Sequence, residues 1–334
     1  MSVRRGAITS KILQENVVKS SEKRPPLIEG FIHENQSIMV SSDTGIGKST
    51  VTACWMSEAS AGLPVFGCLF VPRPLIIYYI PFERGNQEIM ERFKHIQEVI
   101  PINYENIYIN DNFAGLNVTN DKHADEIITN IHEDIGERHI DVIVLDPIYA
   151  SVAGGLSTDE KASQFVRFST RLMTEFKCSN KLLHHTSRDT YSSQTGVKIE
   201  KDDPFYGSMW LKAHCNGGFF LKKNPATDGT VMINKKDSQG VLLDKIPLGY
   251  KPESYTVFLK GLDLSMLAKD RLLMAYRTFK KSNKKVTFAQ IQGCMMGVSD
   301  SHLRELLRTP PFLTAFKKHI SIGDNTLYEP LVEL

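Results

Sequence analysis

One short glycine-containing segment constrains this chain more than any other feature of its sequence. The apolar run Ile38–Val40 is followed by Ser42-Asp43-Thr44-Gly45-Ile46-Gly47-Lys48-Ser49-Thr50, which opens a stretch with helical character. The segment matches the pattern GxxxxGK[ST], except that Ser42 stands at the position of the first glycine. Such a loop wraps phosphate groups with its backbone N–H groups, while its lysine reaches the phosphate oxygens and its serine ligates Mg²⁺. The sequence therefore predicts a nucleotide site at residues 43–50.

Composition excludes several classes of protein. The 334 residues are 41% hydrophobic and 23% charged, which is typical of a globular chain. The longest apolar stretch, Leu75–Ile80, is far shorter than the roughly 20 residues of a membrane span, and no apolar core follows Arg4 and Arg5. Five cysteines lie at irregular spacings without a CxxC pair, which argues against a disulfide framework and a structural zinc site. We expect a cytoplasmic protein with no membrane partner.

The chain divides into three regions. Residues 1–26 are polar and basic, end in Pro25-Pro26 and are predicted to form an arm. In residues 27–264, short apolar runs alternate with amphipathic stretches near 48–61, 86–99, 122–136 and 160–177. The apolar runs are Ile38–Val40, Leu75–Ile80, Ile107–Ile109, Val142–Leu145 and Lys181–Leu183. This alternation predicts an α/β fold with a mainly parallel sheet. Hairpin-like strands around Phe219–Lys222, Val231–Ile233 and Tyr255–Leu259 would extend one edge of the sheet.

Residues 265–334 have a different texture. Helices are expected at 267–281, 287–296 and 299–307, followed by a hairpin over 320–331 that turns at Gly323-Asp324-Asn325. Three short helices and a hairpin suit a winged helix, which would place 299–307 in the recognition position. A protein-docking domain is the alternative interpretation.

Polar residues follow the other apolar runs. Asp146 ends the run 142–145, where a phosphate-loop enzyme needs a carboxylate for Mg²⁺. Glu83 lies just beyond 75–80 and is placed to polarise an attacking water, although position alone also fits an ordinary loop glutamate. His184-His185 ends the run 181–183, and no third ligand nearby supports a metal site there.

The order of these motifs resembles RecA-fold ATPases of the kind found in plasmid RepA-like hexameric replicative helicases. The resemblance covers roughly residues 27–262 and rests on the phosphate loop, Phe82-Glu83, Leu145-Asp146-Pro147-Ile148 and His184-His185-Thr186-Ser187-Arg188. It implies a RecA-like core that binds ATP and Mg²⁺ and assembles as a homo-oligomer, with a hexamer as the expected form. It further implies three catalytic groups, namely Lys48, Glu83 as the water-activating carboxylate and His185 as the γ-phosphate sensor.

The resemblance implies other site residues as well. Arg92 matches an arginine that flanks the adenine, with a solvent-facing helix arginine as the alternative, and Tyr250 is a second base contact. Ser49 and Asp146 would hold the metal. Where the family carries a Lys-x-Arg finger that reaches the neighbouring subunit, this chain has only Lys235 and Lys236. Because lysine lacks the bidentate fork of arginine, a lysine finger would stabilise the transition state less specifically.

Charge points to a polyanionic partner. Residues 1–24 carry a net charge of +4, residues 267–334 carry +5, and the middle is acidic at −7. Segment 187–206 contains Arg188, Lys198 and Lys201, which we expect to contact the phosphates of single-stranded DNA. A lid over the nucleotide is the alternative for this segment, and ordinary solvated faces are the alternative for the basic ends.

The sequence thus predicts an ATP hydrolase stimulated by single-stranded DNA, and a replicative ring helicase in particular. A replication protein would bind through residues 265–334. A recombination or strand-annealing ATPase of the same fold remains open. So does an ATPase that regulates a protein partner and ignores nucleic acid.

Overall fold

The computed structural model describes most of the predicted core and part of the C-terminal region. The N-terminal arm 1–23 lies outside the described residues, as does most of the segment expected to bind DNA. The described residues are 24–67, 69–83, 86–156, 158–185, 190–191, 198–199, 209–224, 229–259, 272, 276, 285–293, 295, 300–308, 312–319 and 327–330.

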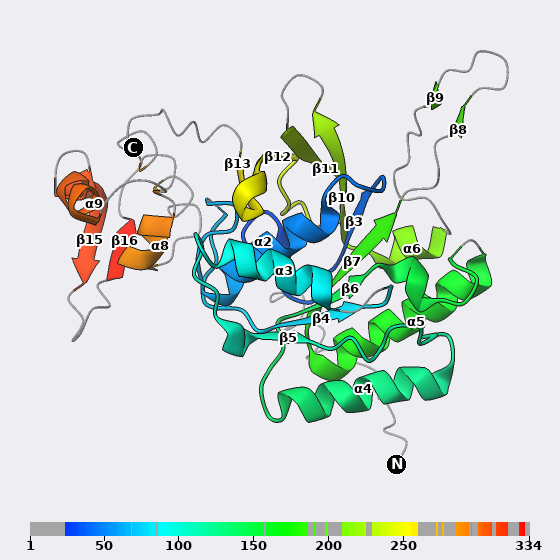
Figure 1. Cartoon of the computed structure of the whole chain (residues 1–334). Helices are drawn as coiled ribbons and strands as arrows, with labels where there is room; N and C mark the ends of the chain where they lie inside the picture. The colour runs from blue at the N-terminus through cyan, green and yellow to red at the C-terminus, as the bar shows by residue number, and fades with distance from the viewer. Residues whose placement is uncertain are drawn as a thin grey trace, which may run out of the picture.

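The core is a nine-stranded sheet in the order β13-β12-β11-β10-β3-β7-β6-β4-β5 (Figure 1). Six of its strands run parallel: β10 (Gly217–Asn224), β3 (Ser37–Ser42), β7 (Ser179–His185), β6 (Val142–Asp146), β4 (Ile77–Pro81) and β5 (Ile107–Ile109). An antiparallel part continues from β10 through β11 (Gly229–Asp237), β12 (Lys245–Lys251) and β13 (Thr256–Leu259). The mainly parallel α/β core is therefore confirmed. Strand β12 was not predicted, because its lysines and glycine interrupt the apolar pattern.

Register brings the predicted site residues to one edge of this sheet. Ser42 is paired with His185 across β3 and β7, and Pro81 is paired with Asp146 across β4 and β6. All four strands run in the same direction, so their carboxyl ends share an edge. The phosphate loop, the residues after β4 and the ends of β6 and β7 meet there, as the sequence pattern predicts.

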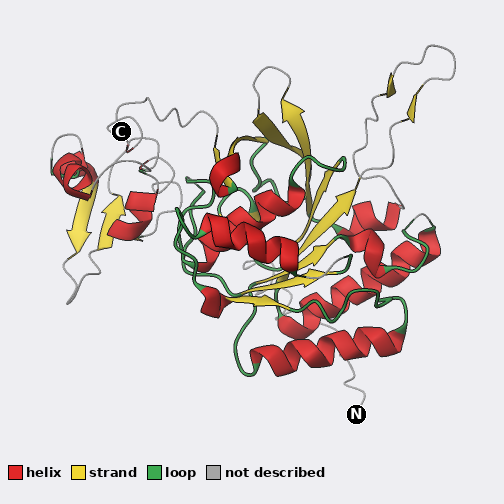
Figure 2. Ribbon diagram, viewed as in Figure 1, coloured by secondary structure: helices red, strands yellow, loops and turns green. Residues whose placement is uncertain are grey.

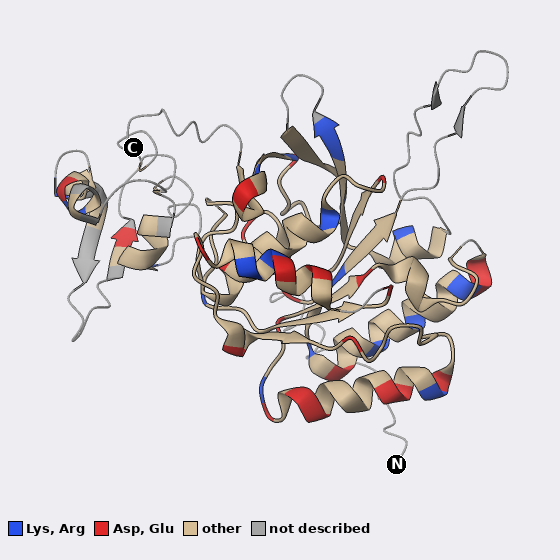
Figure 3. Ribbon diagram, in the orientation of Figure 1, with Lys and Arg blue, Asp and Glu red and all other residues tan. Residues whose placement is uncertain are grey.

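Helices cover both faces of the sheet (Figure 2). Helices α2 (Lys48–Ser60) and α3 (Gln87–Ile96) pack on one face, and α4 (Asp121–Ile135), α5 (Asp159–Phe176) and α6 (Met209–His214) pack on the other. Asn120 and Thr158 begin α4 and α5 by accepting backbone hydrogen bonds through their side chains. Figure 3 shows acidic and basic residues along the outer surfaces of α3, α4 and α5, whereas the central strands carry few.

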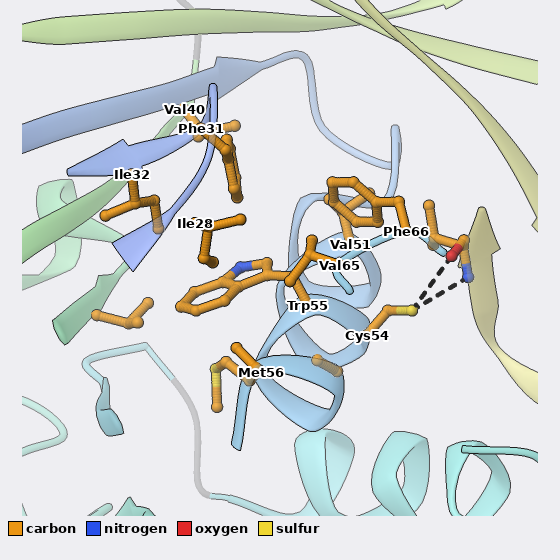
Figure 4. Packing of buried hydrophobic residues seen from close by; sticks show 14 of the residues in the cluster. Ile28, Phe31, Ile32, Val40, Val51, Cys54, Trp55, Met56, Val65 and Phe66 are labelled. Carbon is orange, nitrogen blue, oxygen red and sulfur yellow. Dashed lines mark hydrogen bonds between the residues drawn. The ribbon is translucent and has the colours of Figure 1, made fainter. Parts of the chain in front are cut away.

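Helix α2 departs from the amphipathic pattern expected for it. Residues 51–60 are buried all round the helix, because the sheet, α3 and β13 enclose it. Trp55 is fully buried and meets the ring of Phe31 edge-on at 6.2 Å, as Figure 4 shows in part. Burying a side chain of this size contributes about 1.5–3 kcal/mol. The core thus holds the helix that begins with the phosphate-loop lysine on every side.

Short elements complete the core. A small hairpin of β1 (Pro26–Ile28) and β2 (Ile32–His33) precedes β3, and β8 (Thr190–Tyr191) pairs with β9 (Lys198–Ile199) beyond β7. Single turns of 3₁₀ helix in the described core are η1 (Tyr104–Asn106), η2 (Ile148–Ser151) and η3 (Pro252–Ser254). No helix in the described part of the chain is both long and apolar enough to cross a membrane.

The C-terminal region forms a small mixed unit. Its described elements are β14 (Val286–Thr287), α8 (Phe288–Gly293), α9 (Asp300–Leu306), α10 (Phe312–Ala315), β15 (Phe316–His319) and β16 (Leu327–Pro330). The three strands form an antiparallel sheet in the order β14-β16-β15. The hairpin predicted over 320–331 is wrong at its start, because its first strand is β15. Of the helix predicted over 267–281, only Leu272 and Tyr276 are described, and both are helical.

This unit contacts the core through the segment between α2 and β4. Phe70 belongs to the same buried cluster as Tyr276 and Phe316. The side-chain amide of Gln290 donates a 2.8 Å hydrogen bond to the carbonyl oxygen of Val71, and its own oxygen accepts from the backbone N–H of Thr287 at 2.8 Å. The C-terminal unit is therefore attached to the ATPase core by both apolar packing and a buried amide.

Candidate functional site

The phosphate loop joins β3 to α2 at the carboxyl edge of the sheet. Gly45 and Gly47 have φ values of 81° and 96°, a region that side-chain-bearing residues rarely adopt. A methyl group on either glycine would meet no atom within 4 Å, so both face open space. This is the cradle that phosphate groups require, with the start of α2 directed at it. The chain thus has the backbone geometry needed to hold a nucleotide.

Lys48 is buried at the base of this loop. Its Nζ donates to the side-chain oxygen of Ser42 at 2.8 Å and to the Ser42 carbonyl oxygen at 3.1 Å. The serine that replaces the usual first glycine therefore orients the lysine. Burial lowers the pKa of Lys48 to about 8, against the opposing charges of Asp146, Asp43 and Glu83. Phosphate oxygens at the loop would favour its charged form in the same way.

Lys48 also contacts the predicted phosphate sensor. Its Nζ lies 3.1 Å from Nδ1 of His185, at the end of β7. Burial, together with the charge of Lys48, lowers the pKa of His185 to about 4. The imidazole is therefore neutral near pH 7, and its Nδ1 accepts the lysine hydrogen bond. The structure brings these two predicted residues into direct contact.

The predicted metal ligands also lie together. Oδ2 of Asp146 accepts hydrogen bonds from Ser49 Oγ at 3.2 Å and from the Tyr79 hydroxyl at 2.6 Å. Burial raises the pKa of Asp146, while these two hydrogen bonds and Lys48 favour its ionised form. A hydroxyl and a carboxylate at this spacing are the donor set that Mg²⁺ takes beside a phosphate loop. The described residues fit this cation, although no cluster of three His, Cys, Asp or Glu side chains occurs among them.

Glu83 faces the same region from the end of β4. It lines a pocket of about 70 Å³ with Ser49, Asp146 and Arg92. One of its carboxylate oxygens, Oε1, accepts a hydrogen bond from the hydroxyl of Tyr149. The predicted water-activating carboxylate and the predicted metal ligands thus border one small polar space.

The two predicted base contacts lie in different places. Tyr250, 43% exposed, lines a pocket of about 310 Å³ beside the phosphate loop. The full lining of this pocket is Gly45, Ile46, Gly47, Thr50, Val51, Lys223, Gly229, Thr230, Leu248, Gly249, Tyr250 and Val257. Arg92 borders the smaller pocket instead, where its Nε donates to Thr50 Oγ1 at 3.3 Å. Its predicted contact with a base stays a prediction.

The remaining predicted residues lie apart from these pockets. Lys235 and Lys236 are in β11, and Lys236 is paired with Gly218, level with Met39 in the first half of β3. The Nζ of Lys236 donates to the carbonyl oxygen of Lys212. Arg188 and Lys201 lie outside the described residues, and of Lys198 only the backbone in β9 is described.

Sequence reasoning missed two tyrosines that hold the acidic groups. Tyr79 is inside the apolar run 75–80 and donates to Asp146, while Tyr149 follows the metal-binding strand and donates to Glu83. A phenol in a fully buried strand is a usable signal, because a buried hydroxyl needs a hydrogen-bond partner. For Tyr149 the available signal was its place three residues after Asp146, at the same edge of the sheet.

Comparisons with known proteins agree with this geometry. A search of curated protein sequences gives no match. Among solved structures, an isolated ATPase domain matches with a TM-score of 0.54 at 13% identity, over 76% of this chain and 99% of that one. A DnaB-like replicative helicase, solved with its interactions with primase in view, matches with a TM-score of 0.51 at 12% identity, over 77% and 68%. At these identities the likeness establishes the fold, a RecA-like core.

The AAA_25 family, described as an AAA domain, matches residues 8–190, which is more than half of the chain and includes the phosphate loop, Glu83, Asp146 and His185. The chain therefore belongs to the AAA_25 family of AAA domains and is a P-loop ATPase with a RecA-like core.

Proposed function

We propose that this protein is an ATP- and Mg²⁺-dependent ring ATPase that is stimulated by single-stranded DNA and acts as a replicative helicase. The observation that carries the ATPase part is the meeting of Lys48, His185, Asp146 and Glu83 at one sheet edge. The helicase part rests on the likeness of the fold to the solved ATPase domain and to the DnaB-like helicase.

Each side chain has a distinct task in ATP hydrolysis. Lys48 neutralises the β- and γ-phosphate oxygens, and Ser49 and Asp146 hold the metal. Mg²⁺, when bound, bridges the two phosphates and offsets their charge. Glu83 accepts a hydrogen bond from the attacking water and orients it in line with the γ-phosphate. His185 detects whether the γ-phosphate is present, because it shares Lys48 with that group.

The larger pocket is suited to the base and sugar. It adjoins Gly45 and Gly47 and is bounded by the strands β10 to β13. Tyr250 offers a half-exposed ring on which a base can stack, and Lys223 offers a cation at the rim. The adenosine would lie against the antiparallel strands, while the phosphates extend toward Lys48.

Single-stranded DNA is the proposed stimulus. Met209 and Trp210, at the start of α6, are 81% and 53% exposed, and the exposed Lys212 follows on the same helix. Aromatic rings beside cations are how single strands are held without sequence preference. Arg188, Lys198 and Lys201, in the segment that leads to α6, remain predicted phosphate contacts. A hexamer, a finger from Lys235 or Lys236, and a replication partner bound through residues 265–334 also remain predictions.

The test is steady-state ATP hydrolysis with and without single-stranded DNA. We expect strong stimulation in the wild-type protein. The Glu83→Gln variant should keep nucleotide binding and lose hydrolysis, because an amide cannot accept the proton of water in the same way. Glu91→Gln, an exposed glutamate of α3, is the matched control and should behave as wild type. Unchanged turnover in Glu83→Gln would remove that residue from the mechanism.

The response to DNA decides between the alternatives. Salt-dependent stimulation followed by strand displacement supports the helicase, since phosphate contacts weaken as salt rises. Stimulation without strand displacement would favour a recombination or annealing ATPase. Hydrolysis indifferent to DNA would favour an ATPase that regulates a protein through residues 265–334.

A further inference from the structure

Tyr149 joins the two strand ends that carry the predicted metal ligand and the predicted base. It lies in η2, directly after β6, and its hydroxyl donates to Oε1 of Glu83, which follows β4. These strand ends are tied together, since the backbone N–H of Phe82 donates to the carbonyl oxygen of Asp146 at 2.8 Å. Tyr149 therefore reaches Glu83 from a fixed position on the neighbouring strand.

The same ring contacts the phosphate sensor. The rings of Tyr149 and His185 meet edge to face with centroids 5.2 Å apart. His185 in turn contacts Lys48, 3.1 Å away. One side chain thus touches both the carboxylate that would orient water and the histidine that would report the γ-phosphate.

Tyr149 also begins a segment that leaves the site. After η2 the chain passes through Gly154 and Gly155, both with positive φ, before α5 begins. The segment is attached to the core by single contacts, among them Val118 N–H to Ser151 O at 2.8 Å and Lys161 Nζ to Ala153 O at 2.6 Å. The loop after the metal-binding strand is one of the two that sequence reasoning directs toward nucleic acid. A displacement of this segment would move Tyr149 first.

The hydrogen bond has a cost for catalysis. A carboxylate oxygen that already accepts a phenol hydroxyl is less available to a water molecule, because both compete for the same lone pairs. Hydrogen bonds to charged groups are the stronger ones, so the competition is effective. As long as Tyr149 holds Oε1, Glu83 is a poor partner for water.

We propose that Tyr149 is a positioning residue that restrains Glu83 in the resting enzyme and releases it when nucleic acid displaces the segment after β6. This inference rests on the proposed function, in which Glu83 orients water and single-stranded DNA is the stimulus. It supplies the physical link between the two, from the segment after β6 through one phenol to the carboxylate.

The test variant is Tyr149→Phe, which removes the hydroxyl and keeps the ring against His185. We expect the DNA-independent kcat to rise about tenfold, the effect of losing one hydrogen bond to a charged acceptor. The KM for ATP should not change, and the ratio of DNA-stimulated to basal kcat should fall toward one. Tyr108→Phe is the matched control, because its hydroxyl accepts a hydrogen bond from Arg138 away from the site.

A second variant shows whether Tyr149 acts through Glu83. Tyr149→Phe combined with Glu83→Gln should be as inactive as Glu83→Gln alone, which a general loosening of the fold would not produce. An unchanged or reduced basal kcat in Tyr149→Phe overturns the restraint, even if wild-type protein is stimulated by DNA. If wild-type protein is not stimulated, the proposed function fails. A raised basal kcat would then support the restraint and overturn its release by DNA.

Discussion

The parallel and antiparallel parts of the sheet approach the phosphate loop with different chemistry. The parallel strands β4, β6 and β7 end in ionisable groups that hydrogen-bond to one another or to Lys48. The antiparallel strands β11 to β13 instead border a pocket lined by groups such as Leu248, Gly249 and Val257. Changes in the parallel part should therefore affect turnover, and changes in the antiparallel part should affect nucleotide affinity.

The largest effect is expected in the parallel part. Lys48→Ala removes the cation that neutralises the phosphates and leaves Ser42 and His185 without their shared partner. Turnover should fall by roughly 10²–10³ or more, the range seen when one preorganised electrostatic contact is removed. Steady-state ATP hydrolysis measures this, with the exposed Lys94→Ala in α3 as the control. Residual turnover above a tenth of wild type would contradict the role assigned to Lys48.

A smaller effect of a different kind is expected in the antiparallel part. Tyr250→Ala removes the half-exposed ring from the larger pocket while leaving the parallel strands intact. Loss of a stacking contact worth about 1 kcal/mol should raise the KM for ATP about fivefold and leave kcat unchanged. Tyr104→Ala, a similarly exposed tyrosine on η1, is the control. A fall in kcat with unchanged KM would mean that the two parts of the sheet do not divide the work in this way.

The two parts also differ in how much the sequence predicts. In the parallel part each buried strand is a short apolar run and the next polar residue is a site residue, so Asp146, Glu83 and His185 were found from position alone. In the antiparallel part the backbone pairs regardless of apolar pattern, as in β12, whose lysines interrupt it. The larger pocket is formed by residues from α2, β10, β11, β12 and β13 that no local pattern connects.

Contacts between side chains were the other feature beyond sequence reasoning. The hydroxyls of Tyr79 and Tyr149 bond to Asp146 and Glu83 across strands that are more than 60 residues apart in the chain. Periodicity finds which face a residue is on, but not its partner on the neighbouring strand. The departure at Ser42 has an explanation of the same kind, because its side chain holds Lys48.

Two histidines separate catalytic position from simple burial, and they give the smallest expected effect. His185 contacts Lys48, whereas His214 at the end of α6 contacts Ser169 through Nε2 at 2.9 Å, away from either nucleotide pocket. Burial lowers the pKa of each from 6.5 to about 4, with Lys48 adding to the shift at His185 and Lys236 at His214. The unfolded chain then takes up protons near pH 6.5 that the folded chain refuses until about pH 4. Stability should therefore fall as pH decreases through this window.

Replacing each histidine by glutamine tests this distinction. Each variant removes one of the two groups, so each should make the free energy of unfolding less dependent on pH between 6.5 and 4, as chemical denaturation at a series of pH values would show. Only His185→Gln should also lower ATP turnover at neutral pH, because only His185 shares Lys48 with the γ-phosphate. If His214→Gln lowered turnover as much as His185→Gln, the contact with Lys48 would not be what sets His185 apart. The sensing role would then lose its structural basis, since burial alone would account for both residues.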